Sequence, residues 1–422
     1  MPQLRLRERG AALLELPWGL PLDAWPAAEL EFRDLPVGPS RHLVRFLVAD
    51  GLTFALKEEP LAIANAEFDV LRRLETAGLP AVTAVGLAAL PDRDSAILVT
   101  EYLAFSIQYR RLLMRFPLGA GPYRDRLLDA MASLLVDLHR AGVYWGDCSL
   151  ANTLFRRDGD RIQAYLVDAE TSEIHPSLSD GQRAYDLDIL VENVAFGLAD
   201  LGAMQGRSDA FDDAVTAAEI VRARYDAVWE ELHRETQVAL DDRHVIRARI
   251  RRLNDLGYAI DEVALDPVST PANTVTLRIA VANRRFHAHQ LQKLTGLVVL
   301  EGQARLLLND MREYQAWLEW SERSSVPAEV ATGRWLAEVL EPAISALVPV
   351  IGPLRDPVQA YCDVLETKWL LSEAAGRDVG LEAAISAYLD HGAPAPEAGG
   401  VAASSMALDI DWSSGFDRDE TG

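Results

Sequence analysis

Two stretches of this 422-residue chain decide its fold: Trp145-Gly-Asp147-Cys-Ser-Leu-Ala-Asn152 and Leu166-Val-Asp168-Ala-Glu170. Between them the sequence has the pattern of a β-hairpin, with a turn at Arg157-Asp-Gly-Asp160. A hairpin would bring Asn152 and Asp168, at its two ends, back to one place. Amide and carboxylate oxygens are suitable ligands for Mg²⁺. The two stretches therefore predict a metal site at the base of a hairpin.

A lysine stands upstream of these stretches at the end of a predicted strand. Lys57 closes the alternating run Leu52-Thr-Phe-Ala-Leu-Lys57, so its ammonium would project from a rigid element. The apolar spacing of residues 62–76 predicts a helix directly afterwards. Glu67 and Glu75 on that helix could pair with Lys57, and we expect Glu67 because Glu75 falls in the last turn.

Together, Lys57, Asp147, Asn152 and Asp168 supply what transfer of a γ-phosphoryl group from ATP requires. A metal ion and a cation must neutralise the phosphates, and the acceptor oxygen must be held in line. Asn152 and Asp168 could bind Mg²⁺, or Mn²⁺ in its place. Asp147 could orient or deprotonate the acceptor hydroxyl. Taken singly, each residue has an ordinary structural explanation that is about as good. Lys57 could be a strand lysine whose ammonium reaches solvent, and Asn152 or Asp168 could form a turn or a cap. The prediction therefore depends on the combination of the residues.

The same residues resemble a known superfamily. Gly146-Asp147-x-x-x-x-Asn152 and Asp168-x-Glu170 are similar to motifs of the aminoglycoside and choline phosphotransferases, a branch of the protein-kinase-like superfamily. Over most of its length, to about residue 390, the chain resembles an actinobacterial family of unknown function with a lipopolysaccharide kinase-like N-terminal half. That wider resemblance is carried by residues 38–46, 145–157, 165–171 and 250–257.

The resemblance implies an α+β, two-lobed protein-kinase-like fold with an additional, mostly helical α/β C-terminal domain. It implies that Asp147 is the catalytic base, and that backbone groups of Glu101 and Leu103 meet adenine. A buried strand without ligand contact is the competing interpretation of that segment. Asp186 resembles the aspartate that bonds the backbone of the catalytic loop, although a capping carboxylate would explain it nearly as well. Glu170 is expected to support the site.

Two places depart from the pattern of an active kinase. Trp145 stands where the superfamily usually has a His that braces the catalytic loop. The segment Gly38-Pro-Ser-Arg-His42, which stands where the superfamily has a glycine-rich loop, contains only one glycine that would let backbone amides approach phosphates. Ser40 and Arg41 could contact the phosphates instead, or the segment could be an ordinary turn.

These departures leave several functions open. The first is an ATP- and Mg²⁺-dependent phosphotransferase acting on an unidentified hydroxyl acceptor, which could be a small molecule, a sugar or a protein. The alternatives are a pseudokinase, meaning a nucleotide-binding regulatory or scaffold protein, and an AMP transferase.

The composition limits the partners and the compartment. A formal net charge of −23 and a pI near 4.8 oppose binding to nucleic acid or to an anionic membrane. The sequence has no apolar run long enough for membrane insertion or for a signal peptide. Two cysteines, Cys148 and Cys362, fit a reducing compartment. We therefore expect a cytoplasmic protein.

The pattern along the chain predicts five regions. These are an N-terminal leader (1–30), a small lobe (31–103), a large lobe (104–237), a C-terminal domain (238–391) and a disordered acidic tail (392–422). The C-terminal domain or the tail could bind a protein partner. The main cationic concentrations lie at residues 243–256 and 284–289. They could form a basic patch for an anionic ligand or for the other domain, or a solvated helix face with local ion pairs. His287 and His289 offer a weak zinc signal.

Overall fold

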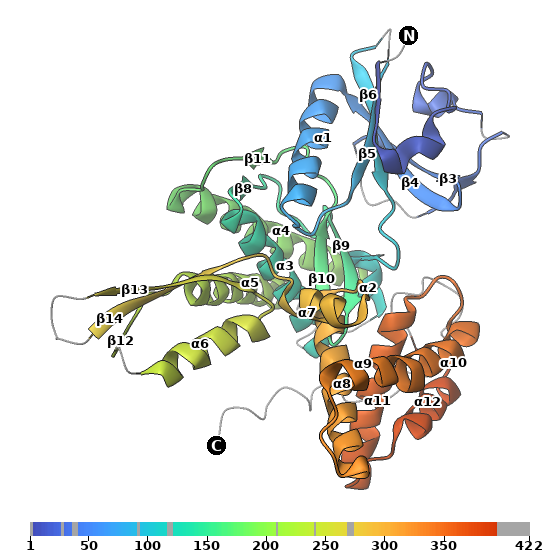
Figure 1. Cartoon of the computed structure of the whole chain (residues 1–422). Coiled ribbons are helices and arrows are strands. Elements are labelled where there is room, and N and C mark those ends of the chain that lie inside the picture. Colours follow the sequence, from blue (N-terminus) through green and yellow to red (C-terminus); the bar gives the residue numbers. More distant parts are fainter. Residues whose placement is uncertain are drawn as a thin grey trace. The chain divides into compact units, whose positions relative to one another are not determined.

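The computed structural model describes residues 3–26, 29–35, 41–90, 93–115, 121–207, 210–239, 242–267 and 274–394 (Figure 1). The chain divides into two compact units. The first contains residues 1–120, 127–155 and 164–225, and the second contains residues 121–126, 156–163 and 226–422. The second unit thus includes two short segments from the middle of the chain. The five regions predicted from the sequence stay a prediction in their boundaries.

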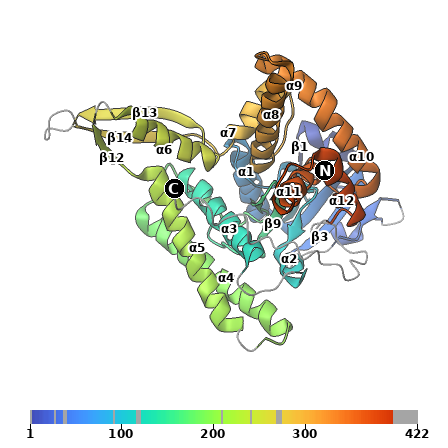
Figure 2. The same ribbon diagram turned by 90° about the horizontal axis from the view of Figure 1, so that it is seen from below.

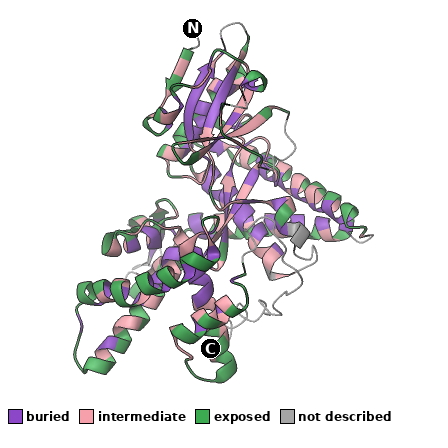
Figure 3. Ribbon diagram, turned by 90° about the vertical axis from the view of Figure 1, so that its right-hand side faces the viewer, coloured by how far each residue is buried: buried purple, intermediate pink, exposed green. Residues whose placement is uncertain are grey.

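An antiparallel sheet of six strands forms the first lobe of the first unit, in the order β1-β5-β6-β4-β3-β2. The strands are β1 (Gln3–Leu6), β2 (Phe32–Arg33), β3 (Leu43–Ala49), β4 (Leu52–Pro60), β5 (Ala84–Ala89) and β6 (Ser95–Glu101). A two-residue turn joins β3 to β4, and both Asp50 and Gly51 have positive φ there, as the twist of a tight hairpin favours. Strands β5 and β6 are largely buried (Figure 3). Helix α1 (Leu61–Thr76) packs on them (Figure 1).

Residues 3–26 belong to this sheet and its core. Strand β1 pairs with β5, and short 3-10 helices follow at Glu8–Leu13 and Leu22–Ala24. The rings of Trp18 and Trp25 meet edge to face at 5.3 Å within a buried apolar cluster that includes Phe54. Each indole donates to a backbone carbonyl five residues earlier. The segment expected to be a leader is therefore an integral part of the strand-rich lobe.

Helices dominate residues 107–233, most of which belong to the first unit. They are α2 (Tyr109–Arg115), α3 (Pro122–Arg140), α4 (Asp180–Met204) and α5 (Ala210–His233). Short strands lie between α2 and α4: β7 (Ile107–Gln108), β8 (Val143–Tyr144), β9 (Thr153–Asp158), β10 (Arg161–Leu166) and β11 (Glu173–Ile174). Strand β9 lies between β7 and β10, and β8 pairs with β11. The predicted hairpin is therefore present as β9 and β10, and the predicted α+β, two-lobed fold is confirmed.

The long C-terminal stretch of the second unit, from residue 226 onward, contains a three-stranded antiparallel sheet in the order β12-β14-β13. Its elements are β12 (Thr236–Ala239), α6 (Arg243–Asp255), β13 (Ile260–Pro267), β14 (Thr274–Val281), α7 (Phe286–Thr295), α8 (Glu301–Glu322), α9 (Ala328–Trp335), α10 (Glu341–Ile351), α11 (Pro357–Ala375) and α12 (Leu381–Asp390). A π-helical turn, Leu336–Leu340, joins α9 to α10. Helices α11 and α12 lie side by side (Figures 1 and 2). Trp335 and Tyr361 fill the core among these helices.

The predicted basic patch loses two of its members. Arg249 is buried and donates to the hydroxyl of Thr236 and to backbone carbonyls at the end of α5, so it stabilises the fold instead of facing solvent. His287 is buried, and its Nδ1 lies 2.7 Å from Glu301. His289 is exposed. In the part of the chain that the structure describes, neither histidine belongs to a group of three or more metal-ligating side chains.

Within the described residues, no helix is both long enough and apolar enough to cross a bilayer. Residues 395–422, for which the sequence predicts an acidic tail, lie outside the described residues.

Candidate active site

Lys57 lies at the centre of a group of carboxylates. Residues 57 and 59 point to the same face of β4 because side chains alternate along a strand. The ammonium nitrogen of Lys57 lies 2.8 Å from Glu67 of α1, 2.8 Å from Glu59 and 3.1 Å from Asp168. Glu170 follows at 3.8 Å. The structure thus brings Lys57, Glu67 and Asp168 together, as the sequence predicts, and adds Glu59.

Burial and charge act in opposite directions on this group. Burial alone would lower the pKa of Lys57, but the carboxylates of Glu67, Asp168 and Glu59 outweigh it and raise the pKa above its usual value. Burial raises the pKa of Glu67, and Asp168 and Glu59 add to that effect against the opposing attraction of Lys57. The group therefore contains more carboxylates than the single ammonium of Lys57 can neutralise.

Glu67 also connects α1 to the Asp168 segment. Its Oε1 accepts a hydrogen bond from the backbone N–H of Ala169, at 3.1 Å, while its Oε2 accepts from Lys57. Glu75, the other candidate on this helix, binds the guanidinium of Arg7. The pairing that the sequence favoured for Lys57 is the one that the structure has.

Asp147 and Asn152 contact each other directly. The amide nitrogen of Asn152 donates to Oδ2 of Asp147 at 2.9 Å and to its backbone carbonyl at 3.1 Å. The backbone N–H of Val167 donates to the carbonyl of Asn152 at 3.1 Å. This bond closes the base of the β9–β10 hairpin, so that Asp168 follows directly after a residue fixed to Asn152.

Asp186 of α4 braces the loop that contains Asp147. Its fully buried carboxylate accepts from the backbone N–H groups of Trp145 and Gly146, both at 2.8 Å, and contacts His139 at 3.0 Å. Burial would raise the pKa of Asp186, but these hydrogen bonds, with a further one from Cys148, lower it below its usual value. The carboxylate of Asp186 thus contacts the backbone of the loop, which is the contact that the resemblance implies.

The loop that contains Asp147 is supported although Trp145 stands in place of the usual His. The side chain of Trp145 is fully buried, and its carbonyl accepts hydrogen bonds from the hydroxyls of Thr171 and Ser172. Its indole nitrogen has no hydrogen-bond partner among the described residues. The imidazole of His139, at the end of α3, reaches Asp186 on one side and the hydroxyl of Tyr225 on the other. A polar brace is thus present at another position of the chain.

Sequence reasoning missed His139, although one signal was available. A histidine at the end of an apolar helix pattern, a few residues before a predicted catalytic loop, is placed to point into that loop.

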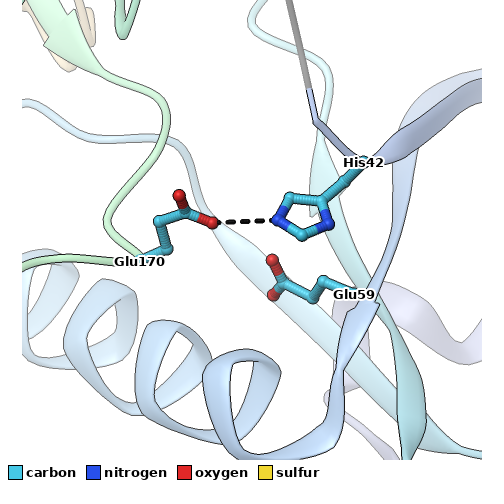
Figure 4. Close-up of side chains that lie close together, drawn as sticks. All are labelled: His42, Glu59 and Glu170. Atoms are coloured by element: carbon cyan, nitrogen blue, oxygen red, sulfur yellow. Dashed lines mark hydrogen bonds and ion pairs between the residues drawn. The ribbon is translucent and has the colours of Figure 1, made fainter.

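His42, Glu59 and Glu170 form a second cluster beside Lys57 (Figure 4). Each offers a ligand atom within 4.8 Å of the others, and Nε2 of His42 lies 3.1 Å from Glu170. Arg41 also binds Glu170, at 2.8 Å. The predicted phosphate-contacting residue Arg41 is therefore paired with the second carboxylate of the D-x-E sequence. Glu59 and His42 were also missed, although Glu59 stands two residues after Lys57 in a strand and must share its face.

Several backbone groups at the end of β6 and just after it make hydrogen bonds. The N–H of Glu101 donates to Thr83 and that of Tyr102 to Thr53, both at 2.9 Å. The carbonyl of Leu103 accepts from the hydroxyl of Ser106. Gly38 and Ser40, the other two residues expected to contact phosphates, lie outside the described residues.

Known proteins resemble this chain in two separate segments. Residues 48–207 match the family described as the lipopolysaccharide kinase (Kdo/WaaP) family. Residues 227–392 match a family described as a domain of unknown function, DUF4032. The first segment contains Lys57, Asp147, Asn152 and Asp168, so the described site lies within the kinase match.

One curated relative and one solved structure are similar to parts of this chain. The lipopolysaccharide core heptose(I) kinase WaaP of Pseudomonas aeruginosa is 28% identical over 152 residues, which are 34% of this chain and 55% of the relative. The chain thus spans about half the length of that relative. A structure of WaaP in complex with acyl carrier protein covers 60% of this chain and 98% of its own, at 22% identity and a TM-score of 0.34. The chain is thus similar to the Kdo/WaaP lipopolysaccharide kinase family over residues 48–207 and to the DUF4032 family over residues 227–392.

Proposed function

We propose that this protein is an ATP- and Mg²⁺-dependent phosphotransferase of kinase type that acts on a hydroxyl acceptor. The observation that supports this most strongly is the ammonium of Lys57, held between Glu67 at 2.8 Å and Asp168 at 3.1 Å. In kinases, a lysine paired with a helix glutamate contacts the phosphates of ATP, beside an aspartate that binds the metal ion. The match of residues 48–207 to a kinase family supports the same class.

The donor set at the base of the hairpin fits Mg²⁺. Asn152 and Asp168 offer oxygen ligands, and the amide nitrogen of Asn152 already binds Asp147, which leaves its side-chain oxygen directed away from that contact. The side chain of Asp168 is 29% exposed, so it is accessible to an ion from solvent. Bound there, Mg²⁺ would neutralise phosphate charge and orient the transferred group.

In this proposal the remaining residues orient the reactants. Asp147 accepts the proton of the acceptor hydroxyl, and its position is fixed by Asn152 and by the Asp186 brace. Lys57 contacts the phosphates of ATP, with Glu67 behind it. The carbonyl of Glu101 and the N–H of Leu103 bind adenine, since the N–H of Glu101 and the carbonyl of Leu103 are engaged with Thr83 and Ser106.

The acceptor is proposed only as a class: a hydroxyl of a small molecule, a sugar or a protein side chain. The kinase relative phosphorylates what its name states, a heptose of lipopolysaccharide core, and a sugar acceptor is the natural first class to supply to this chain.

Labelled ATP tests the proposal. Purified protein with Mg²⁺ and a pool of acceptors from cell extract receives either γ-labelled or α-labelled ATP. We expect the γ label to appear in an acceptor and the α label to stay in ADP, and Asp147→Asn to lower the transfer by about 10²-fold or more. Transfer of the α label would establish an AMP transferase. No transfer of either label, with binding of Mg²⁺ and ATP intact, would establish a nucleotide-binding protein instead of an enzyme.

A further inference from the structure

The tip of the β9–β10 hairpin belongs to the second unit, whereas its base carries the proposed metal ligands. Residues 156–163 lie in the second unit by their contacts, while residues 127–155 and 164–225 lie in the first. The chain therefore enters the C-terminal unit and returns from it between Asn152 and Asp168. Contacts within the first unit alone would not account for a hairpin tip that belongs to the second unit.

Five successive tip residues are each bound by a separate residue of α8 or of the start of α11. We call these five partners the hairpin clamp: Asp356 binds Arg156, Asp363 binds Arg157, the backbone N–H of Gln303 binds Asp158, Gln359 binds Gly159, and Arg305 binds Asp160.

Gln359 makes the most specific of these contacts. Its Oε1 accepts from the N–H of Gly159 at 2.8 Å, and its Nε2 donates to the carbonyl of the same residue at 2.9 Å. The side chain of Gln359 thus pairs with the turn as a neighbouring strand would. The residue is 2% exposed, so both backbone groups of Gly159 would be left buried and unpaired without it.

The turn and the start of α8 approach each other too closely for side chains. Gly159 has a φ of +66°, and a Cβ there would lie 2.9 Å from the backbone of Gly302. A Cβ on Gly302 would lie 2.2 Å from the carbonyl of Asp158. Asp158 is 4% exposed, and its carboxylate accepts the N–H of Gln303 in the first turn of α8, where a negative charge is favoured. Two glycines and a capping carboxylate therefore fix the hairpin tip against this helix.

The clamp residues are also bonded to one another. Gln303 donates to Asp356 at 3.0 Å and to Gln359 at 3.3 Å, and Gln359 donates to Asp363 at 3.0 Å. A buried, connected polar network of this kind has one low-energy arrangement, because each member constrains the next.

We propose that the hairpin clamp positions the metal ligands of the active site, with Gln359 as its central positioning residue. The identity of the metal site rests on the proposed function, whereas the contacts between the hairpin clamp and the hairpin tip do not depend on that function. Asn152 directly precedes β9, Asp168 stands two residues after the end of β10, and the Val167–Asn152 bond joins the two ends. A tip held in one place keeps both strands in register, and hence keeps the two ligands at one separation. A ligand or partner that loosens the clamp would lower metal affinity at a distance.

The test compares two substitutions in α11 of the full-length protein. Gln359→Leu removes both bonds to Gly159 and keeps most of the volume. Tyr361→Phe, two residues away, removes another buried hydrogen bond, from its hydroxyl to Asp310, which keeps the indole of Trp335 as a partner. Arg305→Met, which removes only the ion pair with Asp160, provides a milder change in the clamp if Gln359→Leu does not fold.

Two measurements are made on each variant. The first is hydrogen exchange at the amide of Val167, which reports on the hairpin base without any ligand. The second is the Mg²⁺ concentration that gives half of the ATP-dependent rise in melting temperature.

We expect Gln359→Leu to accelerate exchange at Val167 by roughly tenfold or more and to raise the Mg²⁺ midpoint several-fold, and Arg305→Met to act in the same direction more weakly. Tyr361→Phe should lower stability but change neither reading. Equal effects of Tyr361→Phe and the clamp variants, or no effect of the clamp variants on either reading, would overturn the proposal. If the wild-type protein shows no Mg²⁺-dependent stabilisation, the proposed function fails, and the exchange comparison alone still decides whether the clamp holds the hairpin base.

Discussion

The ammonium nitrogen of Lys57 lies 2.8 Å from a carboxylate oxygen of Glu59, no farther than from its helix partner. The side chain of Glu59 is fully buried, and its Oε1 has no hydrogen-bond partner within the described part of the chain. A buried carboxylate that is only half satisfied is costly. Its negative charge also opposes the phosphates that Lys57 is proposed to bind.

Neutralising Glu59 should therefore favour nucleotide binding, whereas neutralising Glu67 should impair it. Glu59→Gln removes the opposing charge, so we expect Mg²⁺-ATP to bind more tightly and the ligand-free protein to be at least as stable. Glu67→Gln loosens the partner that orients Lys57 and should weaken binding. Titration of each variant with Mg²⁺-ATP, followed by melting temperature, checks both. The reverse order of affinities would make Glu59 the functional partner of Lys57.

Asp147→Asn separates binding from chemistry. The substitution keeps the size of the side chain but removes its ability to accept a proton. Turnover should fall by about 10²-fold or more, while the stabilisation by Mg²⁺-ATP stays at the wild-type level. Turnover with the labelled substrate and melting temperature with the nucleotide are measured on one preparation. Wild-type turnover in the variant would remove Asp147 from the proposed proton transfer.

Trp145→Phe should leave activity largely intact. The loop is held by the backbone groups of residue 145 and by Asp186 with His139, none of which depends on the indole. The smaller ring leaves a cavity, so stability should fall, but by less than the roughly 3–5 kcal/mol of truncating a buried aromatic to Ala. Denaturant unfolding and turnover check the two parts. His139→Phe is the contrasting variant, and there we expect turnover to fall, because the Asp186 carboxylate that braces the loop loses its contact with His139.

Glu366 should make the stability of the protein fall as pH rises. Burial raises its pKa to about 7, against the attraction of Arg157 and Arg126, from an unperturbed value of 4.5. Between these two values the folded state binds more protons than the unfolded state, so the free energy of unfolding decreases with rising pH, and the cost is complete above about pH 7.

Glu366→Gln removes this cost. The variant should be more stable than wild type at high pH, by up to about 3 kcal/mol, and should differ little from it at pH near 5. Urea unfolding at the two pH values measures the difference. A gain of equal size at both would show that charge on Glu366 is not its cause.

Much of the site was predictable because its residues carry local signals. Lys57 ends a run of alternating apolar residues that predicts a strand, and Glu67 stands on the helix predicted directly after it. The turn sequence at residues 157–160 predicts a hairpin that brings Asp168 close to Asn152. What could not be predicted depends on partners far apart in the chain. His139 and Asp186 stand 47 residues apart in the chain and meet only in the folded protein, and the burial of Arg249 depends on carbonyls at the end of α5.

The hairpin clamp shows the same limit more clearly. Gln359 follows Gly159 by 200 residues, and nothing in either local sequence indicates that they bond. From sequence, the C-terminal region shares no motif with the kinase segment and reads as a separate domain. Residues 156–163 lie within that unit all the same.

The most direct test of the central claim is the melting temperature of the protein with ATP, in the presence and absence of Mg²⁺, for the wild type and for Asp168→Asn. A ligand stabilises the state that binds it. If Asp168 is a metal ligand and Lys57 meets phosphate, ATP should raise the melting temperature of the wild type only with Mg²⁺ or Mn²⁺ present, and Asp168→Asn should abolish the rise. An equal rise in the variant, or a rise in the wild type that is independent of metal, would contradict the proposed site.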